Sequence, residues 1–154
     1  MNIYTIRLSK KLLLWAGGIL FALIIALALL LSGNDATPTG SAIDGIRDKG
    51  DQVAYLENLG YEVDQSSRTS KKVTIPQQFD DVYLTYNRLQ QECGFDLLHY
   101  TGKKVELVTY TVTNYPTGEA VLADLLLYGD KLIGGAIYTT AIDGFMHGLR
   151  PADK

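Results

Sequence analysis

The chain has 154 residues, a formal net charge of −3 at pH 7 and a single cysteine. One cysteine excludes an intramolecular disulfide, so the folded part must be stabilised by core packing alone. The linear sequence contains no basic patch or stripe, which argues against nucleic-acid binding and against docking on anionic lipid.

The most apolar segment is Leu12–Leu31, twenty consecutive residues without a charged or strongly polar side chain. A helix rises ~1.5 Å per residue, so this length spans the ~30 Å hydrocarbon core of a bilayer. Trp15 fits an interfacial anchor. A cleaved signal peptide is the alternative, but its apolar region is usually ~7–15 residues long, and Leu31 stands where a small residue is needed. Asn34 replaces the cysteine that a lipoprotein site requires. We therefore expect an uncleaved transmembrane helix.

The charges that flank this segment predict its orientation. Arg7, Lys10 and Lys11 precede it, whereas the first basic residue after it is Arg47. Positive charge stays cytoplasmic, so the chain from about Ser32 onward is expected outside. All seventeen Asp and Glu residues lie there, so the outer part carries about −6. The expected organisation is a cytoplasmic tail over 1–11, a transmembrane helix over 12–31, a linker over 32–41 and one extracytoplasmic domain over 42–154.

Two helices are predicted in the outer part. The first covers about Ala42–Leu59, but glycines weaken its first half, so it is firm only from Asp51. The second covers Phe79–Cys93, where apolar residues recur every three or four positions, and Gly94 ends it.

Short apolar runs rich in Val, Thr and Tyr predict the strands. Gly129-Asp130 is a two-residue connection with glycine first, which is typical of a type II′ hairpin. The polar stretch 64–72 is predicted to be a loop, and the tail 141–154 to be irregular. The class is therefore α+β, with two helices packed on an antiparallel meander sheet in two layers. The predicted strands are 61–63, 73–75, 95–100, 105–115, 120–128 and 131–138.

Pairing outward from the hairpin assigns its side chains to two faces. One face is almost wholly apolar, and a helix is expected to lie over its small residues Gly134 and Ala136. The other face places Asp124 opposite Gly135, with Tyr128 at the end of the strand. This is the predicted position of a small ligand-binding cleft. The alternative is that Asp124 is structural, at an edge or hydrogen-bonded to neighbouring backbone.

Five residues could carry catalysis. Cys93 is a candidate nucleophile, with His99 or His147 as base and Asp96 or Asp143 as the group that orients the base. Cys93, however, lies on the apolar stripe at the C-terminal end of its helix, where the dipole disfavours a thiolate. A buried packing thiol is the simpler interpretation.

No local pattern predicts a metal site. His99 and His147 lie forty-eight residues apart, without the paired spacing of zinc ligands. A site that these histidines build with a distant carboxylate remains an alternative. Asp44, Asp48 and Asp51 fall on one side of a helix rather than around a calcium loop. No metal and no cofactor are expected.

Several segments together resemble a known family. They are YLENLGYEV (55–63), VTIPQQFDDVYLTYNRLQQECGFDLLHYTGK (73–103), YTVTNYP (110–116) and LIGGAIYTTAIDGFMHGL (132–149). The chain resembles the Firmicutes family of small membrane-anchored proteins called domain of unknown function 4830. The resemblance implies a bacterial, extracytoplasmic setting and an ordered segment at 143–149. It implies no activity.

The expected function is a non-enzymatic binding or protein-interaction module, tethered to the bacterial membrane by Leu12–Leu31. Its partner is another envelope protein, a peptide or a glycan, and no nucleic acid. One alternative is a cell-envelope hydrolase that uses Asp96, His99, Asp143 and His147. The other is a structural or assembly protein whose transmembrane helices pair through small residues.

Overall fold

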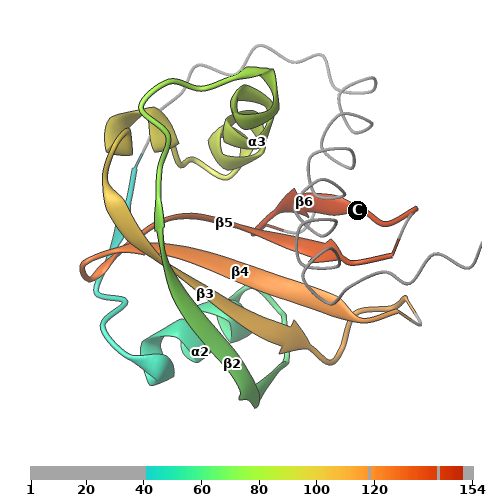
Figure 1. Cartoon of the computed structure of the whole chain (residues 1–154). Helices are drawn as coiled ribbons and strands as arrows, with labels where there is room; N and C mark the ends of the chain where they lie inside the picture. The colour runs from blue at the N-terminus through green and yellow to red at the C-terminus, as the bar shows by residue number, and fades with distance from the viewer. Residues whose placement is uncertain (1–40, 118, 142, 151–154) are drawn as a thin grey trace, which may run out of the picture.

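The computed structural model describes residues 41–117, 119–141 and 143–150 (Figure 1). The predicted transmembrane helix Leu12–Leu31, and the predicted linker up to residue 40, lie outside these residues. Within the described ranges, no helix is both long and apolar enough to cross a membrane.

The described chain forms one antiparallel six-stranded sheet with two α-helices and a short 3-10 helix, so the α+β class is confirmed. The strand order is β1-β5-β4-β3-β2, and β6 also pairs with β5. The elements are β1 (Ile43–Asp44), α2 (Lys49–Asn58), β2 (Val63–Thr74), α3 (Asp81–Glu92), η1 (Leu97–Tyr100), β3 (Lys104–Val112), β4 (Val121–Tyr128), β5 (Lys131–Thr139) and β6 (Met146–Gly148).

The helices cover opposite faces of the sheet, which corrects the predicted two-layer arrangement (Figure 1). Leu56 of α2 belongs to a core with Val108 on one face. Tyr86 of α3 belongs to a second core with Leu126 on the other face. Because the central strands are apolar on both faces, each face needs its own cover.

The first helix begins at Lys49, later than Ala42 and close to Asp51, from which the sequence predicted a firm helix. Asp48 caps α2 by accepting a hydrogen bond from the Asp51 backbone N–H, and the Asp51 side chain accepts from the Asp48 N–H in return. Ile43 belongs to the edge strand β1 instead of the helix. Gly45 has a φ of +91°, a left-handed value that favours glycine and turns the chain away from β1 toward α2.

The second helix is confirmed, but the segment after it is not the predicted strand. α3 begins after its cap Asp80 and has Cys93 as its C-cap. Residues 97–100 form η1 because Asp96 accepts from the Leu98 backbone N–H, and Asn87 of α3 accepts from the Leu97 N–H. These two side chains satisfy the backbone where a strand would need a partner strand.

The β4–β5 hairpin is confirmed, and Gly129 has the positive φ (+63°) expected at the first turn position. Beyond Leu127 and Leu132, the predicted register is wrong by one residue, because a bulge at Ile133 shifts the pairing. Ile133 and Gly134 consequently face the same side of the sheet, toward α3.

This bulge moves the small residues to the face of α3. A Cβ atom at Gly134 would lie 2.7 Å from Oε1 of Gln90 on α3, so the close approach of a helix over Gly134 is confirmed. Ala136 joins the same core. The predicted face was wrong, because an apolar pattern cannot reveal one extra residue within a strand.

The polar stretch 64–72 is strand, and not the predicted loop. β2 runs continuously from Val63 to Thr74 along β3, with an irregularity between Asp64 and Thr69. Ser67 stabilises the irregular part, since its Oγ accepts from the Thr111 N–H at 2.8 Å.

The tail contains the ordered segment that the family resemblance implied. Residues 146–148 form β6, which pairs with residues 136–138 of β5. The described part of the tail is therefore less irregular than its glycine content predicted.

Candidate functional site

β2 is an edge strand of 12 residues with only β3 beside it (Figure 1). No described residue pairs with its outer side. Most of its side chains are exposed and polar. An edge of this kind presents backbone N–H and C=O groups that another extended chain can pair with. β2 is therefore the candidate site for the binding of a partner.

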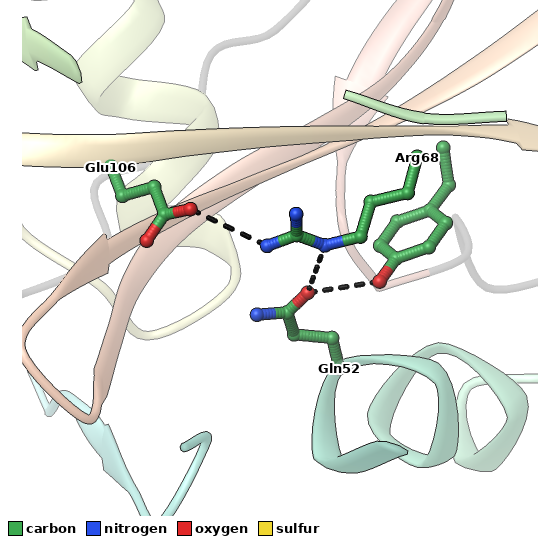
Figure 2. Close-up of polar contacts among 4 residues, drawn as sticks. Gln52, Arg68 and Glu106 are labelled. Atoms are coloured by element: carbon green, nitrogen blue, oxygen red, sulfur yellow. Dashed lines mark hydrogen bonds and ion pairs between the residues drawn. The ribbon is translucent and has the colours of Figure 1, made fainter. Parts of the chain in front are cut away.

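Arg68 of β2 lies at the centre of a polar cluster that also contains Gln52, Glu106 and Tyr110 (Figure 2). Its Nε donates to Gln52 Oε1 at 3.1 Å, and its Nη2 lies 3.3 Å from Glu106 Oε1. Gln52 Oε1 also accepts from the Tyr110 hydroxyl at 2.9 Å. Burial raises the pKa of Tyr110, so its hydroxyl stays protonated as a donor.

This cluster joins three elements. Gln52 comes from α2, Arg68 from β2, and both Glu106 and Tyr110 from β3. Gln52 and Tyr110 are buried, whereas the Arg68 side chain is 27% exposed. The buried members thus fix the stem of Arg68 and hold a partly exposed cation at the open edge.

The pairing of β2 with β3 gathers basic residues from two distant parts of the sequence. Lys71 and Lys72 are exposed on β2. Lys103, just before β3, and Lys104, its first residue, are also exposed, and Lys104 pairs with Thr74. Segments 68–74 and 103–106 hold five basic side chains and one carboxylate, Glu106. The linear sequence showed no basic patch, because the pairing of the two strands creates it.

Asp124, the carboxylate of the predicted cleft, is buried in the central strand β4 on the face of α3. It pairs with Ala136, so the predicted pairing with Gly135 is wrong. Its Oδ1 accepts from the Thr109 hydroxyl at 2.5 Å, and the Tyr138 hydroxyl also donates to the carboxylate. Burial raises the pKa of Asp124, although these hydrogen bonds oppose the shift. Side-chain hydroxyls, and not neighbouring backbone, satisfy this carboxylate.

Gly135 packs against the Asp124 backbone, whereas Tyr128 lies away from Asp124. A Cβ atom at Gly135 would collide with the Asp124 backbone oxygen and with Leu149, so the glycine is required for packing. Tyr128 lies four residues along β4, is 39% exposed, and packs its ring 5.6 Å from that of Tyr100. The bulge at Ile133 is the reason that Gly135 pairs with Leu125 and not with Asp124.

Asp96 acts as a structural acceptor in this fold. Its carboxylate accepts from Asn87 Nδ2 at 2.9 Å and from the Leu98 N–H at 3.0 Å. Burial raises the pKa of Asp96, but these bonds and one from Gln91 outweigh it, so the net shift is downward. His99 lies on η1 close enough to lower this pKa further, and its side chain is exposed.

His147 lies on β6 in an aromatic stack. Its Nε2 is 2.9 Å from the Tyr115 hydroxyl and its Nδ1 is 2.6 Å from the Gly148 carbonyl oxygen. Its ring stacks on Phe145 with centroids 5.6 Å apart. Asp143 is exposed. In the described ranges, the hydrogen bonds and ring contacts of His147 are with Tyr115, Phe145 and Gly148, and not with another member of the predicted catalytic set.

Cys93 is buried at the end of α3, where the sequence predicted a packing thiol. Its Sγ accepts weakly from the Arg150 backbone N–H at 3.5 Å. A Cβ atom at Gly148 would collide with this sulfur, so β6 packs closely on the helix end. In the described ranges, no group of three His, Cys, Asp or Glu residues is arranged to hold a metal ion.

Fold and site together define a small α+β domain whose sheet has one open and basic edge. The model of the family Domain of unknown function (DUF4830) matches residues 55–137, more than half of the chain, and the protein belongs to this family. No curated protein and no solved structure matches the chain. The matched range includes Arg68, Glu106 and Tyr110 but not Gln52.

Sequence reasoning did not identify the Arg68 cluster. Two signals were present: an arginine within a polar stretch, and Gln52 at a position that the helix buries. Neither signal identifies its partner, because Gln52 and Tyr110 lie fifty-eight residues apart.

Proposed function

We propose that this protein is a membrane-tethered interaction module on the outer side of a bacterial membrane, and that it binds another envelope protein along β2. The observation that carries the proposal is the open edge of the 12-residue strand β2, which pairs regularly with β3 from Thr69 to Thr74. An extended segment that joins such an edge forms backbone hydrogen bonds along its length, and side chains on both faces supply specificity.

The contacts that hold β2 in place support this role. The Arg68 cluster ties the strand to α2, and eight register pairs connect it to β3. A strand that is already ordered loses less conformational entropy when a partner binds than a loop would. The fold therefore holds β2 in the extended conformation that pairing with a partner strand requires.

The location is supported by the sequence alone. Leu12–Leu31 has the length and composition of an anchor, and the preceding basic residues favour an external domain. The test is a single cysteine introduced between residues 35 and 40 and probed in intact cells with a membrane-impermeant thiol reagent. We expect labelling, with little background from the buried Cys93. Labelling only after lysis would reverse the orientation.

Binding along β2 is tested by site-specific photocrosslinking of the full chain in native membranes. A photoreactive residue replaces Ser70 of β2 or, as the control, Glu57 of α2; both positions are exposed. We expect the photoreactive residue at position 70 to give one crosslinked protein adduct. The residue at position 57 should give no adduct of the same mass. Adducts from position 57 alone would show that the partner binds elsewhere and would contradict the proposal.

A further inference from the structure

We infer that the partner presents an extended acidic segment, which pairs with β2 and places carboxylates beside Lys71 and Lys72. This inference rests on the proposed function and names the chemistry of the partner. It is carried by the charge and the geometry of the edge strand.

The charge at this edge differs from that of the rest of the domain. The outer part of the chain is acidic, yet Arg68, Lys71, Lys72, Lys103 and Lys104 lie on β2 and at the start of β3. Glu106 is the only carboxylate in segments 68–74 and 103–106, and it already contacts Arg68. The edge therefore offers an excess of positive charge to a strand laid beside it.

The side chains of Lys71 and Lys72 point to opposite faces of the sheet. Lys71 pairs with Leu107, which belongs to the core under α3. Lys72 pairs with Glu106, which lies on the face of α2 with Arg68. An added strand alternates in the same way, so two consecutive acidic residues would place one carboxylate beside each lysine.

A second copy of this chain fits the edge poorly. In the antiparallel registers that place residues 68–72 of β2 opposite the same segment of another copy, Arg68, Lys71 and Lys72 lie opposite or beside one another. Like charges directly opposite each other destabilise a strand pair. Lysines on an edge strand disfavour pairing with neutral strands and with other copies of the same chain. An acidic strand would neutralise the lysine charges, so it is the kind of strand that can pair with β2.

The test uses the full chain in lipid nanodiscs and three synthetic peptides. They are acetyl-TVTEEVTV-amide, the matched basic peptide acetyl-TVTKKVTV-amide, and the acidic peptide with alternate backbone amides methylated. Hydrogen exchange measured by mass spectrometry reports the protection of residues 63–74, and fluorescence anisotropy reports affinity. We expect only the unmethylated acidic peptide to protect β2, and its affinity to fall as salt is raised.

Charge reversal provides the matched variants. In Lys71→Glu with Lys72→Glu, we expect about a tenfold loss of affinity for the acidic peptide and a gain for the basic one. A misfolded variant would not gain affinity for the basic peptide, so this gain separates the effect of charge from loss of the fold. The control reverses the exposed Arg88 and Arg150, which lie off this edge, and should leave both affinities unchanged.

Three outcomes would overturn the inference. The first is equal binding of the acidic and basic peptides. The second is binding of the methylated acidic peptide with the same affinity as the unmethylated one, or binding of inorganic polyphosphate with that affinity and without protection of β2. Either result would indicate a general polyanion site. The third is an adduct at position 70 whose partner segment has no acidic residues, which would retain the proposed function and remove only the acidic strand.

Discussion

Asp124 shows how one buried carboxylate can be tolerated inside an apolar strand. Thr109 and Tyr138 donate hydroxyl groups to it, and burial still raises its pKa above the ordinary value of 3.8. The negative charge of Asp124 also contributes to the raised pKa of the buried Tyr86. The ionised carboxylate is therefore less favourable in the folded state than in the unfolded chain.

The first prediction concerns Asp124→Asn. Because the folded state holds the Asp124 proton more tightly, the wild type should lose stability relative to the variant as pH rises from about 3.8 through the raised folded pKa. Above that window, the difference should become constant. Urea unfolding of the full chain at stepped pH measures it, with the exposed Asp143→Asn as the control. A difference that does not depend on pH would contradict the raised pKa.

At the scale of elements, Gln52 connects α2 to the edge strand by accepting from both Arg68 and Tyr110. Gln52→Leu should leave the buried Tyr110 hydroxyl without this acceptor, at a cost of about 1–3 kcal/mol. Amide exchange in β2 should also become faster. Adding Tyr110→Phe should recover part of the stability, since both polar groups are then gone. Additive losses in the double mutant would show that the two side chains are not coupled.

The contact of β6 with α3 gives a third prediction, for Gly148→Ala. The new methyl group would collide with Cys93 Sγ and lie 2.8 Å from the Leu89 carbonyl oxygen, which belongs to the helix backbone. A destabilisation of about 1–3 kcal/mol is expected from such overpacking. Cys93→Ala should relieve only the sulfur contact, so the double mutant should recover partly. Full stability of the single mutant by urea unfolding would contradict the close packing.

The elements that the sequence predicted well are those with strong local signals. α3 has an apolar period and a glycine at its end, and the hairpin has Gly129 at its turn. The two ends of β2 were predicted as short strands, but its polar middle, 64–72, was missed, because exposed strand residues need no alternation of apolar side chains. The bulge at Ile133 and the Arg68 cluster depend on contacts between distant residues, which one sequence does not reveal.

For the whole molecule, the two edges of the sheet differ. β1 and β6 cover parts of the outer side of β5, and between them Gln90 of α3 accepts from the Gly135 N–H at 2.7 Å. No comparable cover lies along β2 in the described part of the chain. Among the described residues, β2 is therefore the edge that is left open to another strand.

The fourth prediction concerns self-association through this edge. Lys71→Thr with Lys72→Thr should remove the charge barrier and allow copies to pair along β2. Sedimentation of the full chain in detergent should show more dimer for this variant than for the wild type. The matched control, Arg88→Thr with Arg150→Thr, should sediment like the wild type. An unchanged distribution would show that the lysines do not limit self-pairing.

The position of β1 has a mechanical consequence. β1 is the first described strand and lies at the opposite margin of the sheet from β2. Tension between the N-terminal end of the chain and a cargo on β2 would load the β1–β5, β5–β4, β4–β3 and β3–β2 ladders in series. The weakest of them is the β1–β5 pairing of two residues, reinforced by the Asp44–Lys131 ion pair at 2.6 Å. The β1–β5 pairing should therefore separate first under load. In a single-molecule pulling trace, this separation should appear as a small extension before the rupture of the domain.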